Sequence, residues 1–476
     1  MAKPQVLLLG FLDTKEAEHR FVKGLLEEKG CKVVIVDTSI QHETELSRQA
    51  VHPPPSVCSE VDTTLAHVRS LHRAEALKLM TAGALNIARR YEQEDQLHGI
   101  IGMGGSTTTA LVCDVMRDIK IGVPKICVST MASGDTRPYI GDSDICLMPS
   151  IADISGSLNV LSTRILTNAT SAMAGMAHAF KEYSESSNFS ADDEQAKHLV
   201  AVTMFGLTTP GVNAACERLR SFKDPQSGQR LYEPVVFHCT GSGGRTMERL
   251  IAEKWFHAVL DLTTTELADE QCGGILSAGP TRLTAAGKAG IPQVVSLGAL
   301  DMCNFGPRST VPEKYAHRTL YEHNSSITLL RTSPAECRQM GCEMAKRLSQ
   351  GHGPLLIVIP KKGWSGIDVK GGPFWDPEAD KALVDELKDG FQRSGREVDL
   401  IEAEGDINDK DTAHLMADKL NQLMAKYEQD GAQSSGFTDA TQTEPRNLTV
   451  TIVMEGTEGY QGGISEGTAQ VVSDDR

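Results

Sequence analysis

A glycine-rich turn at residues 102–107 is the clearest place in this sequence for a ligand to bind. Its letters G-M-G-G-S-T follow an apolar run and precede a helical pattern, so the turn should join a strand to a helix. Glycines let the backbone approach a ligand closely, and the first amides of a helix favour anions. Gly104, Gly105, Ser106 and Thr107 are therefore candidate phosphate ligands. The turn matches neither G-x-G-x-x-G nor G-x-x-x-x-G-K-[ST], so a plain tight turn is an equal alternative.

A second polar group follows the first apolar run, in the letters G-F-L-D-T-K. Thr14 and Lys15 can reach a phosphate, and Asp13 can hold a metal ion such as Mg²⁺ directly or through water. The alternative is an ordinary helix cap, because Asp or Thr commonly precedes a helix. These residues are therefore candidates for the same site as the glycine turn.

Further candidates follow the second and fourth predicted strands. Thr38 ends the second strand, where ribose hydroxyls are usually bound, and Thr130, Ser133 and Gly134 follow the fourth. Arg73, near a helix start, can pair with a phosphate or can simply be solvated. Because parallel strands present their carboxyl ends at one edge of a sheet, these groups should converge there.

The second half of the chain has a separate collection of polar residues at predicted strand ends. A carboxylate and a histidine placed there can serve as general base and acid. An arginine beside a glycine turn suits a phosphate or a carboxylate. Taken singly, each histidine is more often a structural or surface residue. The candidates are Glu266, His238 and His323 for catalysis, and Gly243, Gly244, Arg245 and Asp301 for a second ligand site.

The elements that must position these residues alternate along the chain. Continuous apolar runs separated by helical patterns predict two doubly wound, Rossmann-like α/β domains with parallel sheets. The runs near 273–280 and 292–298 belong to this series, whereas residues 40–70 form a polar, proline-rich excursion. A polar, serine-rich stretch at 182–197 marks the boundary, so the domains are predicted at 1–185 and 198–427. Both halves have a glycine turn after a strand, as a duplicated architecture would.

The composition of the chain argues against several classes of protein. The 476 residues carry 47 basic and 63 acidic side chains, a net charge of −16, which argues against bulk nucleic-acid binding. Residues 428–476 contain nine acids and two bases, so they are predicted to be a flexible acidic tail. No run approaches the roughly 18 apolar residues of a membrane span. The 11 cysteines include no C-x-x-C pair, so we expect a soluble, cytoplasmic protein without a disulfide framework or zinc site.

Several of these motifs together resemble one family, the tomato tobamovirus-resistance protein family, otherwise catalogued as uncharacterised. The similarity rests on G-F-L-D-T-K-E-A-E, I-I-G-M-G-G-S-T-T-T-A-L and V-P-K-I-C-V-S-T-M-A-S-G-D-T in the first half. It continues in H-C-T-G-S-G-G-R-T-M-E, L-D-L-T-T-T-E-L and K-G-W-S-G-I-D, and it covers about residues 4–425. The similarity is weakest over residues 40–70.

The resemblance implies ATP with magnesium in the first domain, and dimers. When the family's site is carried onto this chain, the candidate residues around the first sheet become nucleotide ligands. Thr38 and Arg73 are less secure matches, because they border the stretch where the resemblance is weakest. The plant member inhibits viral RNA replication by binding the replicase, a role that depends on a surface and need not transfer. Three hypotheses stay open. The protein is an ATP-using enzyme acting on a small molecule between the domains, a non-catalytic ATP-dependent protein-binding module, or a hydrolase or lyase acting from the second domain.

Overall fold

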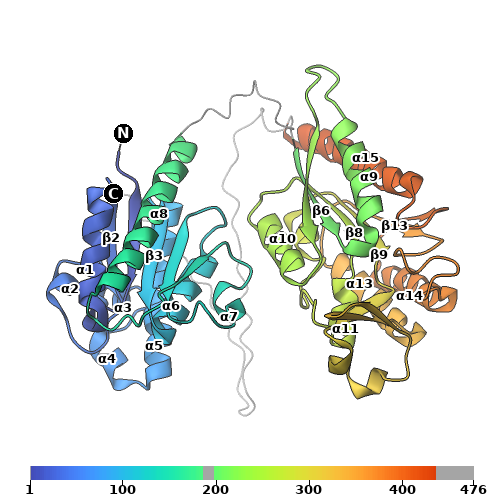
Figure 1. Cartoon of the computed structure of the whole chain (residues 1–476). Coiled ribbons are helices and arrows are strands. Elements are labelled where there is room, and N and C mark those ends of the chain that lie inside the picture. The colour runs from blue at the N-terminus through green and yellow to red at the C-terminus, as the bar shows by residue number, and fades with distance from the viewer. Residues whose placement is uncertain (1, 186–197, 436–476) are drawn as a thin grey trace, which may run out of the picture. The chain divides into compact units, whose positions relative to one another are not determined.

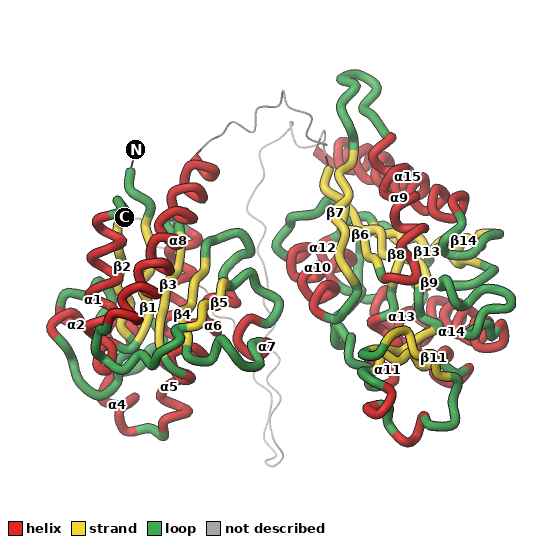
Figure 2. Tube along the Cα trace, viewed as in Figure 1, coloured by secondary structure: helices red, strands yellow, loops and turns green. Residues whose placement is uncertain are grey.

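The computed structural model describes residues 2–185 and 198–435 of the chain (Figure 1). Most of the predicted boundary segment and residues 436–476 of the predicted tail lie outside the described residues. The two predicted α/β domains with parallel sheets are confirmed, and Figure 2 shows strands flanked by helices in each of them. No helix within the described parts of the chain is long and apolar enough to cross a membrane.

The first domain contains a parallel sheet that has five strands within residues 2–185, in the order β2-β1-β3-β4-β5. The strands are β1 (Gln5–Gly10), β2 (Lys32–Asp37), β3 (Gly99–Gly104), β4 (Lys125–Ser129) and β5 (Cys146–Pro149). The helices are α1 (Leu12–Glu28), α2 (Glu45–Arg48), α3 (Pro54–Ser59), α4 (Leu65–Ser70), α5 (Arg73–Gln93), α6 (Ser106–Asp118), α7 (Arg137–Ile140) and α8 (Val160–Glu185).

Alternation along β1 explains why helices cover both faces of this sheet. Leu7 and Leu9 pack into one apolar cluster with α5 and α6, while Val6 and Leu8 pack into another with α1 and α8. Successive side chains of a strand point to opposite faces, so an uninterrupted apolar run must be covered twice. The loops at the carboxyl ends of the strands stay free to form a site.

The second domain contains a parallel sheet with six strands among the described residues, in the order β14-β13-β9-β8-β6-β7. Its strands are β6 (His198–Met204), β7 (Tyr232–His238), β8 (Ala258–Thr263), β9 (Gln293–Gly298), β13 (Leu355–Pro360) and β14 (Asp399–Ala403). Its helices are α9 (Thr209–Ser221), α10 (Ser242–Ala252), α11 (Glu266–Cys272), α12 (Ala285–Ala289), α13 (Pro334–Ser349), α14 (Pro377–Ser394) and α15 (Lys410–Ser435).

Both sheets follow the same path through the chain. In each, the first strand lies between the second and the third, and later strands extend the sheet beyond the third. This order places a switch point between β1 and β3 and another between β6 and β8. The two glycine turns are not equivalent in this order. Residues 102–107 form the end of the third strand, β3, and the turn after it, whereas residues 241–245 follow the second strand, β7, at the sheet's edge.

Four parts of the structure differ from the sequence-based expectation. Residues 273–280, predicted as a strand, form turns, and residues 327–331 lie in a separate antiparallel sheet. That sheet has the order β10-β12-β11, with strands β10 (Met302–Phe305), β11 (Leu320–Asn324) and β12 (Ile327–Arg331). The excursion at 40–70 folds into the short helices α2, α3 and α4, because leucines and valines at Leu46, Val57 and Val68 become buried. Helix α15 also continues beyond the predicted domain end at 427.

Candidate functional site

A cavity of about 510 Å³ lies at the carboxyl edge of the first sheet. It sits at the switch point, where the loops after β1 and β3 diverge, which is the usual ligand position in this architecture. Seven of the predicted ligand residues line its wall, namely Asp13, Thr14, Lys15, Arg73, Gly105, Ser106 and Thr107. The structure therefore brings together residues from three separate parts of the sequence.

The amino end of α6 faces this cavity. Gly105 precedes the helix and offers no capping side chain, and Ser106, Thr107 and Thr108 line the cavity wall. The first amides of a helix have no partners within the helix, and the helix dipole makes this end partially positive. Gly104, just before this helix end, has no room for a side chain, because a Cβ there would lie 2.5 Å from Thr108 Oγ1. This arrangement suits the binding of an anion.

Two cations border the amino end of α6. Lys15 leaves helical geometry (φ −142°, ψ 35°), and its Nζ lies 3.1 Å from Thr14 Oγ1. Its Cε would lie 3.1 Å from a Cβ on Gly104, so the lysine crosses the glycine turn. Arg73, at the start of α5, donates from Nη2 to Thr107 Oγ1 at 3.1 Å. Both positive side chains are therefore placed where phosphate oxygens would meet the helix amides.

Asp13 is the one carboxylate on the described wall of this cavity. Its Oδ2 accepts a hydrogen bond from the Gln41 amide at 3.2 Å, and its own amide donates to Ser39 Oγ at 2.8 Å. The described residues contain no group of three or more His, Cys, Asp or Glu side chains arranged to hold a metal ion. A single carboxylate fits Mg²⁺ only where phosphate oxygens and water supply the other ligands.

The apolar part of the wall was not identified from the sequence. Apart from Phe11, which follows β1, it comes from the excursion between β2 and α5 and from α5 itself, and these parts supply Ile40, Val68, Leu71, Ala76 and Leu77. Arg69 holds this segment in place by donating from Nε to the Ile40 carbonyl at 2.6 Å. Only the apolar residues within a polar stretch could have indicated this wall, and they do not show which surface they cover.

Five predicted residues lie outside the cavity lining. Thr38 is buried, and its hydroxyl donates to the Gly10 carbonyl at 3.0 Å. Gly104 lies behind the turn, and Thr130 Oγ1 would be 3.8 Å from a Cβ on Gly105. Ser133 and Gly134 are exposed in the loop that follows β4. Thr38 therefore has a structural partner, while Gly104 and Thr130 support the turn from behind.

The second domain places Glu266 at the amino end of α10. Glu266 is 1% exposed, and its Oε1 accepts hydrogen bonds from the amides of Gly241 (2.8 Å) and Gly244 (3.1 Å). Its Oε2 accepts from Arg282 Nε at 2.8 Å. Arg282 is itself buried and also pairs with Asp261 and Glu248. The carboxylate thus occupies the position that an external anion would take, and a Cβ on Gly244 would lie 2.1 Å from it.

The other second-domain candidates are spread over different places. His238 is exposed at the end of β7, with its ring near that of Phe205. His323 is exposed on β11 of the antiparallel sheet. Asp301 is buried, accepts from Ser365 Oγ at 2.8 Å, and has its pKa raised by burial. Arg245 donates to the Ser277 carbonyl at 2.9 Å. Neither the cavity at the first sheet nor a larger cavity in the second domain is lined by Glu266, His238 or His323.

The two α/β domains agree with the comparisons to known proteins. Residues 4–182 match the N-terminal domain, and residues 197–424 the C-terminal domain, of an uncharacterised protein family, UPF0261. The chain belongs to this family. The resemblance to the tomato resistance proteins is confirmed by the relatives that it matches.

A UPF0261 protein of Clostridium tetani is 40% identical over 424 residues, covering 89% of this chain and 99% of that protein. The ToMV resistance protein Tm-1(GCR237) of Solanum lycopersicum is 36% identical over 442 residues, covering 89% of this chain and 56% of the tomato protein. Among solved structures, the spinosyn rhamnosyltransferase SpnG is 10% identical over 90% of this chain and all of that chain. Its TM-score of 0.18 is too low to support an argument.

Proposed function

We propose that the first domain binds ATP together with Mg²⁺ in the cavity at the carboxyl edge of its sheet. The observation that carries this proposal is the open amino end of α6, which faces the cavity between Lys15 and Arg73. The α6 amides and the two cations would hold the phosphates. Asp13 would contribute to Mg²⁺ directly or through water, and the apolar wall would pack against the base.

Several features support a nucleotide over a simple anion. The cavity holds both a polar half and an apolar half, as a nucleotide site requires. Its volume of about 510 Å³ lies within the range of about 300–1,000 Å³ typical of small-molecule sites. The resemblance noted above points to the same ligand. Whether the bound ATP is cleaved is a separate question, and the catalytic roles suggested for Glu266, His238 and His323 stay predictions.

Isothermal titration calorimetry with ATP, with and without Mg²⁺, tests the proposal on the full chain. We expect one site per chain, and we expect Lys15→Met to weaken binding about tenfold, because one charge-assisted contact is lost. The matched control is Lys29→Met, since Lys29 is exposed at the other end of α1. Absence of binding by the parent protein, or equal binding by the two variants, would contradict the proposed site.

A further inference from the structure

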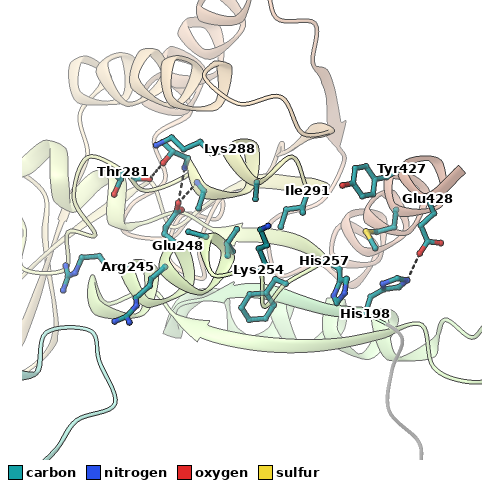
Figure 3. Close-up of a pocket in the computed structure, with 18 residues that line it drawn as sticks. His198, Arg245, Glu248, Lys254, His257, Thr281, Lys288, Ile291, Tyr427 and Glu428 are labelled. Carbon is teal, nitrogen blue, oxygen red and sulfur yellow. Dashed lines mark hydrogen bonds and ion pairs between the residues drawn. The ribbon is translucent and has the colours of Figure 1, made fainter. Parts of the chain in front are cut away.

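A larger cavity, of about 1,050 Å³, lies within the second domain (Figure 3). It is bordered by α10, by α12 with the turn before it, and by residues 424–428 of α15. The residues that matter for its chemistry are Glu248, Ile251, Ala252, Lys254, Phe256 and Lys288.

The cavity lies between one face of α10 and the segment that contains α12 and the turn before it. On α10 the lining residues Arg245, Glu248, Arg249 and Ala252 recur at the spacing of one helix face. On the opposite side, Thr281 and Thr284 lie in the turn before α12, and Ala285 and Lys288 lie on α12 itself. Ala252 on α10 and Ala285 on α12 are small side chains in this lining. Ile251 and Phe256 are buried beneath it and belong to the apolar cluster that joins both helices to the sheet.

The two acidic side chains that line this cavity, Glu248 and Glu428, already have partners within the chain. Glu248 accepts hydrogen bonds from the amides of Leu283 (2.6 Å) and Ala285 (2.8 Å), so it caps the turn before α12. Glu428 pairs with His198 at 2.7 Å. By contrast, no ion pair within the described parts of the chain involves Lys254 or Lys288. The charge that the cavity offers to a ligand is therefore positive.

Lys254 holds a special position in this arrangement. It follows α10 with a φ of 65°, a left-handed conformation that is uncommon for residues other than glycine and asparagine. Figure 3 shows its side chain extending into the space between Glu248 and Ile291. An ammonium group above an apolar floor meets an anionic group and an apolar body at the same time.

We propose that this cavity binds a small amphipathic anion, a molecule with an apolar body and one carboxylate or phosphate group. The apolar body would lie on Ile251 and Phe256 between α10 and α12, and the anionic group would pair with Lys254, with Lys288 nearby. The proposal does not depend on the nucleotide site, because the two cavities share no residue.

Calorimetry with four probes of equal chain length tests this on the full chain. We expect decanoate and decyl phosphate to bind at one site, decanol at least tenfold more weakly, and decyltrimethylammonium not at all. The tighter of the two anions then identifies the preferred head group. Absence of binding by both anions, or binding of the cation as tight as that of the anions, overturns the proposal.

Variants locate the site. Lys254→Met should weaken binding of the two anions about tenfold, which is about 1.4 kcal/mol, because their head group loses its positive partner. Binding of decanol should not change. Ala252→Trp should fill the groove and abolish binding of decanoate and decanol alike. Lys426→Met and Ala425→Trp are matched controls, since both positions are exposed on α15 and neither lines the cavity. Equal binding by each variant and its control overturns the proposed site. If Ala252→Trp fails to fold, the Lys254→Met comparison and the probe series decide the question.

Discussion

The amino ends of α6 and α10 follow similar glycine-rich turns but meet different chemistry. At α6 the turn opens into a cavity bordered by Lys15 and Arg73. At α10 the corresponding amides donate to the buried carboxylate of Glu266, which is held in turn by Arg282. Both helix ends attract an anion for the same physical reason. The second domain supplies this anion from its own chain, while the first leaves the position open to an external one.

The contrast shows that a glycine turn before a helix identifies an anion position without showing what fills it. In the second sheet the turn follows the edge strand β7, and the carboxylate that reaches it, Glu266, follows β8, which lies on the other side of β6. In the first sheet it follows the central strand β3 at the switch point, where diverging loops leave room for a ligand. Four experiments can break or sharpen this comparison.

The largest effect is expected from removing the internal anion. Glu266→Ala should reduce the free energy of unfolding by about 3–5 kcal/mol, because it breaks a buried ion pair and leaves two amides unsatisfied. Equilibrium urea unfolding measures this change. Glu322→Ala is the control, since Glu322 is exposed on β11 and its removal should change stability by less than about 0.5 kcal/mol. Equal stabilities of the two variants would mean that Glu266 does not fill an anion position.

The reverse experiment introduces an internal anion into the first domain. Gly105→Asp should weaken ATP binding at least about 100-fold, which is about 2.7 kcal/mol, because its carboxylate would repel phosphate at the α6 amides. The nearest atom to a Cβ at this position is Thr130 Oγ1 at 3.8 Å, so the side chain fits.

Gly105→Asn is the matched control for Gly105→Asp, because the two side chains differ mainly in charge. The asparagine variant should lose much less affinity, and both should unfold at a temperature close to that of the parent protein. Similar losses of affinity in the two variants would indicate a steric effect instead of an electrostatic one.

The two domains should also respond to pH in opposite directions. Burial lowers the pKa of His19 in the first domain, so the unfolded chain binds more protons there and stability is lost as pH falls below about 6.5. In the second domain, burial and the nearby Asp301 raise the pKa of Asp368, which is fully buried. There the folded chain binds more protons, so stability is lost as pH rises above about 4, towards the raised pKa.

Asp368→Asn tests the second half of this statement. Asp368 Oδ2 accepts from the Trp364 amide at 3.0 Å, and an asparagine carbonyl can do the same. Between pH 6 and pH 7 the ionisation of Asp368 on unfolding should lower the free energy of unfolding of the parent protein by about 1.4 kcal/mol. The variant lacks this group and should not show that decrease. Hydrogen exchange at several pH values, followed separately in each domain, measures the slopes. An unchanged slope in the second domain would show that Asp368 is ionised in the folded state.

The smallest effect is expected from Arg73. Arg73→Met should weaken ATP binding about threefold to tenfold, since the partly exposed guanidinium is screened by solvent and Lys15 remains. Calorimetry measures the loss, and Arg89→Met, on the same helix but away from the cavity, is the control. A larger loss than that of Lys15→Met would reverse the roles assigned to these two cations.

Much of this arrangement could be predicted from the sequence. Apolar runs such as residues 5–10 predicted buried parallel strands, and the glycine turn together with Asp13, Thr14 and Lys15 predicted a polar edge. The placement of Thr38 could not be predicted, because only the folded chain shows its hydroxyl bonded to the Gly10 carbonyl. The apolar wall from residues 40–71 was missed for a similar reason: its short helices are stabilised by burial against distant elements and have no strong pattern of their own.

The sequence by itself determined the alternation of strands and helices and the two helix ends that attract anions, because these depend on residues close together in the chain. The tertiary structure alone decided which end is filled. Glu266 reaches the amides of Gly241 and Gly244 only because β8 ends near the turn after β7. The position before α6 stays open because strand order brings Lys15 and Arg73 to its side instead of a carboxylate. Such contacts between distant segments arise from sheet topology, which local sequence patterns do not specify.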